Sequence, residues 1–267
     1  MSFSVTGKTA IVTGAANGVG LAIARHLADA GANVMFADKD EARLRAEVGD
    51  MADEAKNIRY FAGDLREKLT IANLLSATLD AFDQVDILVN GARQILRTSP
   101  LEQEDESIET MLDQNLMAGF KLSRLVARRM IKQGKNSDRP CVGTIINLSS
   151  IAAQRTQSDL MGFSVSCAAL DQMTRCLAVS LAPERVRVNA VAFGSVMSAS
   201  LQDHLREHPD HREAILAATP QGRIAGPTEV AEAVQFLASD SSSFVTGEIL
   251  IVDGGRSLVD AVSTSLH

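Results

Sequence analysis

The sequence predicts an α/β protein with one doubly wound parallel sheet of about seven strands and helices on both faces. Short apolar runs rich in Val and Ile alternate with longer amphipathic stretches along the whole chain. A glycine-rich turn follows the first apolar run directly, and no repeat, low-complexity segment or linker interrupts the alternation. The 267 residues, 46% of them hydrophobic, are enough for one large core, so we expect a single domain over residues 1–267.

The expected strands are short, and several are rich in Val and Ile with polar residues only at their ends, as is typical of strands buried on both faces. In chain order they are Thr9–Thr13, Asn33–Ala37, Ile58–Ala62, Ile87–Asn90, Thr144–Asn147, Arg187–Val191 and Glu248–Val252. The helical pattern between them predicts Val19–Ala30, Ser107–Gln133, Gly162–Ala182 and Thr228–Ala238, with Gly31, Pro183 and Pro227 at helix boundaries. Residues 197–224 form the one long insertion without strand character late in the chain.

Composition excludes several classes of partner. The chain carries 33 acidic and 26 basic side chains, a net charge of −7, and its Lys and Arg residues are scattered, which argues against nucleic acid or an anionic membrane as the main partner. We expect no membrane span and no signal peptide, because no apolar run is long enough and the N-terminus lacks the basic-then-apolar pattern. The three cysteines, Cys141, Cys167 and Cys176, lack metal-site spacing, so we expect reduced thiols and a cytoplasmic protein.

Two counts restrict any mechanism. The chain has a single tyrosine, Tyr60, and its last lysine is Lys135. A reaction that needs a Tyr or a Lys from the second half of the chain is therefore excluded.

The turn after the first strand, Thr13–Gly20, has glycines at three positions and runs straight into a helix. Glycine lets the backbone turn tightly and come close to a pyrophosphate, while the helix N-terminus offers free N–H groups to it. The segment therefore predicts a dinucleotide-binding loop; the alternative is an ordinary strand-to-helix turn.

Asp38 ends the second strand, where a carboxylate can accept both hydroxyls of an adenosine ribose and would repel a 2′-phosphate. This favours NAD over NADP as the cofactor. The neighbouring Lys39 argues the other way, since it could pair with that phosphate. A solvated turn residue is the remaining interpretation of Asp38.

These segments together resemble the short-chain dehydrogenase/reductase family over nearly the whole chain. The matching segments are Thr13–Gly20, Asp64–Leu65, Asp86–Asn90, Asn115 in its Gln-Asn-Leu context, Gly143–Ser150, Arg187–Val191, Val245–Gly247 and Val252–Gly255. The resemblance implies a Rossmann fold, a homodimer or homotetramer packed through the helices Ser107–Gln133 and Gly162–Ala182, and a mobile lid around 197–224. It implies cofactor contacts from Thr13, Gly14, Asn17, Gly18, Val19, Gly20, Asp38, Asp64, Leu65, Asn90, Gly91, Ala92, Gly194, Val196 and Ser198.

The catalytic pair of that family departs from its pattern here. The family's Tyr-x-x-x-Lys lies thirteen residues after the second serine, which places Phe163 at the tyrosine and Cys167 at the lysine. Four residues apart on a helix, both still face the same side. Phenylalanine has no proton to transfer, and losing general acid–base catalysis typically costs about 10²–10⁴-fold in rate. Cys167 is either a small buried apolar residue or a reactive thiol.

Further departures fall in the same region. Arg93 replaces the glycine of the family's Asn-Asn-Ala-Gly, and Phe193 replaces the proline of its Pro-Gly, with Ser198 where a threonine holds the carboxamide. Arg93 could clamp a pyrophosphate or carboxylate, or fill the nicotinamide space. The adenine half of the site is therefore intact, and the nicotinamide half is altered.

Two positions of the family's catalytic tetrad are retained, Ser150 and Asn115. Either they form a residual polar site for a substrate oxygen, or they satisfy backbone groups. The insertion also holds His204, His208 and His211, but Pro209 interrupts the helix between them and no cysteine joins them, so we expect a solvated lid and no metal site.

Three functions remain in competition. The favoured one is an NAD(H)-binding relative with weak or absent alcohol/carbonyl oxidoreductase activity, acting as a sensor or a silent subunit with an unknown small-molecule ligand. The second is an active NAD-dependent oxidoreductase in which Ser150, Asn115 and water, or the Cys167 thiol, handle the proton. The third is an interaction module whose cofactor cleft is closed by Arg93 and Phe193. Fold alone does not decide between them.

Overall fold

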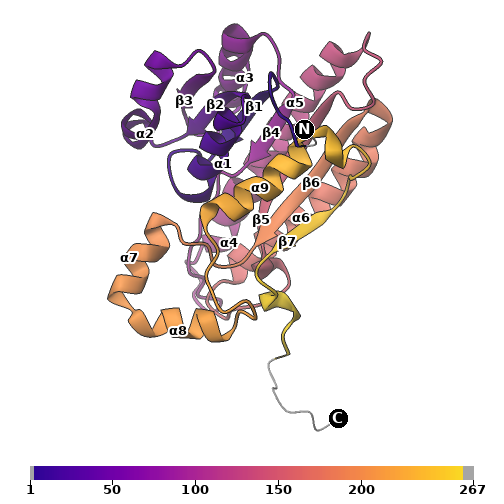
Figure 1. Ribbon diagram of the computed structural model, residues 1–267. Helices are drawn as coiled ribbons and strands as arrows, with labels where there is room; N and C mark the ends of the chain where they lie inside the picture. The colour runs from indigo at the N-terminus through magenta and orange to yellow at the C-terminus, as the bar shows by residue number, and fades with distance from the viewer. Residues whose placement is uncertain (1–2, 261–267) are drawn as a thin grey trace.

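The computed structural model describes residues 3–260 and contains one sheet of seven parallel strands (Figure 1). The strands are β1 (Thr9–Thr13), β2 (Asn33–Asp38), β3 (Ile58–Ala62), β4 (Ile87–Asn90), β5 (Gly143–Ser150), β6 (Val186–Phe193) and β7 (Ile249–Val252). Their order in the sheet is β3-β2-β1-β4-β5-β6-β7. The predicted doubly wound fold is therefore confirmed. The ends of the predicted domain, residues 1–2 and 261–267, lie outside the described residues.

The strand order reverses between β1 and β4. From β1 the chain builds outward to β3, returns to the other side of β1, and continues outward to β7. Neighbouring strands at the reversal are in register, with Val12 of β1 opposite Val89 of β4 and opposite Phe36 of β2. In sheets of this kind, the crevice at the carboxyl ends of the two central strands is where ligands bind.

Helices cover both faces of this sheet. They are α1 (Gly18–Asp29), α2 (Glu41–Glu54), α3 (Lys68–Phe82), α4 (Ser107–Leu112), α5 (Ala118–Gly134), α6 (Met161–Leu181), α7 (Ala199–Glu207), α8 (Pro209–Ala217) and α9 (Pro227–Ala238). One core cluster joins the sheet to α1, α2 and α9, and a second joins it to α3, α5 and α6. None of the helices in residues 3–260 is long and apolar enough to cross a lipid bilayer.

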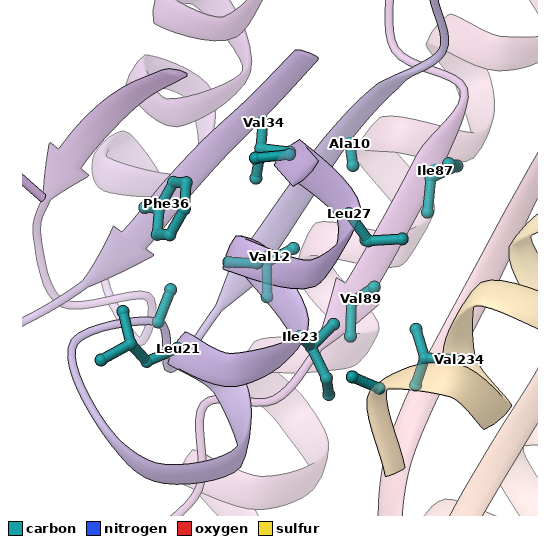
Figure 2. Close-up of a cluster of buried hydrophobic side chains, with 14 of the residues drawn as sticks. Ala10, Val12, Leu21, Ile23, Leu27, Val34, Phe36, Ile87, Val89 and Val234 are labelled. Atoms are coloured by element: carbon teal, nitrogen blue, oxygen red, sulfur yellow. The ribbon is translucent and has the colours of Figure 1, made fainter. Parts of the chain in front are cut away.

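The two cores arise from the alternation of side chains along each strand. In β1, Ala10 and Val12 point into the first cluster while Ile11 points into the second. Figure 2 shows the first cluster, where Leu27 and Ile23 of α1 pack over the strands. Burying a leucine or isoleucine side chain contributes about 1.5–3 kcal/mol, so this layer fixes α1, and with it the turn that precedes α1.

The single helix predicted over Ser107–Gln133 is wrong in its interior. The α-helical hydrogen bonding stops at Leu112, a π-helical turn runs over Asp113–Met117, and α5 begins at Ala118. The wider turn carries one extra residue, and Gln114 and Asn115 within it are buried. The side-chain periodicity used to predict the helix does not detect such a turn.

The insertion at 197–224 contains two short helices, α7 and α8, which meet at Pro209 (Figure 1). Proline is well suited to the first position of α8 because its missing N–H is not needed there. Most side chains of this insertion are exposed, and Leu205 is buried. The insertion follows β6, so it lies at the carboxyl end of the sheet.

Candidate functional site

A groove of about 420 Å³ lies at the carboxyl ends of β1 and β4, where the strand order reverses. It brings together most of the residues that the sequence assigns to the cofactor. Its lining includes Gly14, Asn17, Gly18, Val19, Gly20, Asp38, Asp64, Leu65, Gly91, Ala92 and Ser198, together with Lys39, Arg93, Leu148 and Phe193.

The loop between β1 and α1 has a conformation that requires glycine. Gly14 and Gly18 have φ angles of +71° and +55°, in the left-handed region. A Cβ on Gly20 would lie 2.1 Å from the carbonyl oxygen of Gly14. Because the N–H groups in the first turn of α1 have no partner within the helix, the loop presents donors and the positive end of a helix dipole to the groove. These features fit a pyrophosphate.

Asp38 connects the end of β2 to this loop. One carboxylate oxygen accepts from the backbone N–H of Ala16 at 3.0 Å, and the other accepts from the backbone N–H of Asp40 at 3.1 Å. A carboxylate offers about four acceptor positions, so these two bonds leave capacity for ribose hydroxyls. The side chain is therefore oriented in advance at the adenosine end of the groove, with Lys39 beside it.

Asp64 lies in the same end of the groove and is paired with Arg66. The Arg66 Nε lies 3.0 Å from both carboxylate oxygens, and the Arg66 backbone N–H also donates to Oδ1 at 3.0 Å. The hydrogen bond from this guanidinium holds the pKa of Asp64 below its ordinary value. Asp64 thus stays ionised, as an acceptor for a donor such as an adenine amino group.

Thr13 holds the two central loops together. Its Oγ1 accepts from the backbone N–H groups of Gly91 and Ala92, at 3.0 and 3.1 Å, and donates to the carbonyl of Val89 at 3.3 Å. A Cβ on Gly91 would lie 2.6 Å from the carbonyl oxygen of Thr13. Thr13 therefore holds the backbone that follows β4 against the end of β1, and Gly91 and Ala92 of that backbone line the groove.

Asn90 begins a chain of buried side-chain hydrogen bonds beneath the groove. Its Nδ2 donates to Ser123 Oγ at 2.9 Å and to Asn147 Oδ1 at 2.8 Å, and Asn147 Nδ2 donates to Thr174 Oγ1 at 2.8 Å. The chain connects β4 and β5 to α5 and α6. Sequence reasoning missed Ser123, Asn147 and Thr174; the available signal was a polar residue inside a buried strand or helix face.

Gly194 and Val196 are engaged in backbone pairing. The Gly194 N–H donates to the carbonyl of Val252 at 3.2 Å, and Val196 forms an isolated parallel bridge with Ala225. Ser198 caps α7 through an Oγ that accepts from the N–H of Leu201 at 3.3 Å. Of these three predicted contacts, the structure brings Ser198 to the groove lining.

The positions that the resemblance aligns with the family's tyrosine and lysine lie together beside the groove and not in its lining. Phe163 and Cys167 project from successive turns of α6, each with 4% of its surface exposed. With Asn115, Ser166 and Arg93 they line an inner cavity of about 20 Å³. That volume holds about one water molecule and no ring.

Cys167 packs as an apolar residue in the described structure. It belongs to a small buried cluster with Met111 and Phe163. Burial raises the pKa of the Cys167 thiol to about 11, even though the Arg93 guanidinium acts in the opposite direction. The thiol is therefore protonated at neutral pH, which argues against the reactive interpretation.

The two retained tetrad residues bond the protein's own backbone. Asn115 Oδ1 accepts from the Gln94 N–H at 2.7 Å, while its Nδ2 donates to the Gln94 carbonyl at 2.9 Å and to Ser166 Oγ at 3.1 Å. Ser150 Oγ accepts from the Ala152 N–H at 3.2 Å. Asn115 thus holds the loop after β4 against the π-helical turn, and Ser150 caps the short turn after β5.

Arg93 occupies the space between the altered positions. Its guanidinium carbon lies 4.5 Å from the centre of the Phe193 ring and 5.9 Å from the centre of the Phe163 ring. The side chain lines both the groove and the inner cavity. Burial lowers the pKa of Arg93 from its ordinary value. Three residues that are far apart in the sequence therefore form one stack, which we call the Arg93 stack (Arg93, Phe163 and Phe193).

The three histidines of the insertion come closer than the sequence suggested. The ring centres of His204, His208 and His211 lie 4.7–5.0 Å apart, and His204 Nε2 lies 2.8 Å from His211 Nδ1. The three histidines flank the junction of α7 and α8 at Pro209, where the chain changes direction (Figure 1). Within residues 3–260, no group of three or more His, Cys, Asp or Glu side chains has an arrangement that could hold a metal ion.

Comparisons with known proteins find relatives that match nearly the whole chain. A family model described as enoyl-(acyl carrier protein) reductase matches residues 14–257. The 2-dehydro-3-deoxy-D-gluconate 5-dehydrogenase of Pseudoalteromonas atlantica is 34% identical over 257 residues, 95% of this chain and 97% of that protein. The 3-oxoacyl-(acyl-carrier-protein) reductase of Rickettsia prowazekii is 35% identical over 255 residues, 96% of this chain and 99% of that protein. The crystal structure of a short-chain type dehydrogenase/reductase from Mycobacterium marinum matches with a TM-score of 0.83 at 26% identity, covering 95% of this chain and 96% of that one.

Proposed function

Because the chain belongs to the short-chain dehydrogenase/reductase family, we propose that it binds the adenosine half of NAD(H) and has weak or no alcohol/carbonyl oxidoreductase activity. One observation carries the proposal. The inner cavity lined by Phe163 and Cys167 has room for about one water molecule, and its one thiol is protonated at neutral pH. Family membership supports an oxidoreductase ancestry, and the residues of this site argue against the usual turnover.

The two halves of the groove differ in how well they fit a nicotinamide dinucleotide. The adenosine and pyrophosphate half fits, with the glycine loop, the helix N-terminus and the carboxylates of Asp38 and Asp64 in place. The nicotinamide half does not fit, because Arg93 fills it between two phenylalanine rings. We therefore derive no hydride-transfer step for this chain.

Asp38 supports a preference for NAD(H) over NADP(H). A 2′-phosphate placed at its carboxylate would meet like charge, which Lys39 offsets only in part. Calorimetric titration of the purified chain with NADH and NADPH tests this. Asp38→Asn should narrow the difference in affinity, whereas Glu41→Gln, an exposed carboxylate of α2, should leave it unchanged. Equal binding of both nucleotides by the unaltered chain would contradict the assignment.

The predicted loss of turnover needs its own assay. Initial rates of NAD(H) and NADP(H) consumption or formation are measured with a panel of alcohols and ketones, at protein concentrations up to about 10 µM. A rate lowered by about 10²–10⁴-fold relative to an ordinary enzyme is expected from the missing proton donor. Turnover at ordinary rates would favour the alternative, an active oxidoreductase that uses water with Ser150 and Asn115.

We propose that the chain forms a homodimer or homotetramer and acts as a sensor or silent subunit in the cytoplasm. Val165 and Val179 on α6 expose 44% and 78% of their surface, which is apolar area available to a second copy. The free thiols of Cys141, Cys167 and Cys176 support a reducing compartment. Light scattering tests the assembly, and Val179→Asp should shift it toward the monomer; a monomer before substitution would refute it.

A further inference from the structure

The Arg93 guanidinium is a cation without an anion. Within residues 3–260 it makes no ion pair and no hydrogen bond, and its charge interacts with the two phenylalanine rings and the Cys167 thiol. Two arginines close to it in the sequence or bonded to a groove residue are paired: Arg66 bonds Asp64, and Arg97 lies 3.8 Å from Asp159. Arg93 alone of these three is without a carboxylate.

The aromatic rings attract this charge but do not neutralise it. Cation–π contacts of this kind contribute about 0.5–2 kcal/mol. A guanidinium removed from water normally requires a counter-charge and partners for its five N–H donors. The stack therefore fixes the guanidinium in position and leaves its donors available to a ligand.

The position of the guanidinium decides which ligand fits. Arg93 and the glycine loop line the same groove, so the guanidinium borders the space open to a molecule whose diphosphate lies on the loop. A planar guanidinium pairs with phosphate through two parallel hydrogen bonds. A diphosphate that ends at this point would supply the missing anion, whereas a dinucleotide would have to place its nicotinamide ring where the guanidinium already lies.

We propose that the groove is selective for an adenosine diphosphate, a nucleotide whose diphosphate is its terminus, and that Arg93 is the counter-ion of the terminal phosphate. This rests on the proposed function, because it takes the same groove and the same adenosine half. The proposal narrows the class of ligand. The positively charged nicotinamide ring of oxidised NAD would be repelled by the Arg93 guanidinium, and the ring of NADH would have to displace the Arg93 side chain.

The test is calorimetric titration of the full chain with ADP, AMP and NADH in magnesium-free buffer, since magnesium would neutralise the phosphates. ADP is expected to bind at least about 10-fold more tightly than AMP and NADH, because a charge-assisted bond to the terminal phosphate typically changes affinity by about 10–100-fold. Arg93→Leu should remove most of the ADP advantage and leave AMP binding unchanged. Arg97→Leu, an exposed arginine on the same loop, is the matched control.

Two further measurements keep the test informative if Arg93→Leu does not fold: one uses a second variant and the other uses the unaltered chain. Arg93→Gly opens the space between the rings, so NADH binding should tighten while ADP binding weakens. In the unaltered chain, added salt should reduce ADP affinity more than AMP affinity.

The possible outcomes separate the two proposals. No binding of any of the three nucleotides refutes the proposed function itself. NADH bound more tightly than ADP by the unaltered chain, with Arg93→Leu without effect, refutes only the assignment of Arg93. Binding of ADP and AMP with equal affinity refutes it as well.

Discussion

The protonation of Cys167 gives the most direct test of whether this site retains acid–base chemistry. The perturbation is alkylation by iodoacetamide in a variant with Cys141→Ser and Cys176→Ser, which leaves Cys167 as the single thiol. Its pKa is about 11 in the folded chain, against an ordinary value of 9.0. At pH 8 the thiolate fraction is therefore lower by about 100-fold than for an ordinary thiol, before any steric protection is counted.

Labelling is followed by intact-protein mass spectrometry between pH 7 and the alkaline limit of folding, which circular dichroism monitors. The rate should rise about 10-fold per pH unit without levelling off below pH 10. A variant that keeps only the exposed Cys176 is the control, and it should label at least about 100-fold faster at pH 8. A plateau at Cys167 below pH 8 would refute the burial argument and restore the thiol as a proton carrier.

Three further predictions concern the scaffold of the site. Asn115→Ala removes the hydrogen bonds to the Gln94 backbone and should lower the free energy of unfolding by about 1–3 kcal/mol in urea titrations; an unchanged value would indicate a substrate-facing role. Gly20→Ala places a methyl group 2.1 Å from a carbonyl oxygen and should abolish nucleotide binding by calorimetry, so intact binding would contradict the loop geometry. Arg223 lowers the pKa of Glu229 from 4.5 to about 2, so the contribution of this carboxylate to stability is complete above pH 4.5 and is lost as the pH falls toward 2. The melting temperature of Glu229→Gln should accordingly lie below that of the unaltered chain at pH 7 and approach it below pH 4 in calorimetric scans, and a gap independent of pH would contradict this.

The strands could be predicted because parallel strands buried on both faces appear in the sequence as continuous apolar runs. The predicted Ile58–Ala62 and Ile87–Asn90 coincide with β3 and β4. β5 is longer than predicted, since Ser149 and Ser150 extend it although their side chains are polar. Backbone pairing with β6 continues through both serines, and a hydropathy pattern does not report such pairing.

Motif spacing predicted most of the residues that line the groove, and it predicted none of their contacts. By the resemblance, Phe163, Cys167 and Arg93 stand at positions that depart from the family pattern. The sequence left open whether Arg93 clamps a pyrophosphate or carboxylate or fills the nicotinamide space, because that choice depends on the two aromatic rings that only the folded chain brings near it. The sequence pattern also did not predict the π-helical turn around Asn115. The Asn115 side chain in this turn forms hydrogen bonds with the backbone of Gln94, which lies on another segment.

The Arg93 stack also has a consequence for any attempt to re-engineer activity. Arg93 lies over both phenylalanine rings, so substitutions at Arg93 are expected to be epistatic with substitutions at Phe163 and at Phe193. Phe163→Tyr alone would place a hydroxyl beside an arginine that still fills the space of the reacting ring. Arg93→Gly alone would open that space with no proton donor in it. We therefore expect oxidoreductase activity only when Phe163→Tyr, Arg93→Gly and Cys167→Lys are combined. No single one of these substitutions is expected to produce it, so the three cannot be gained one at a time through active intermediates.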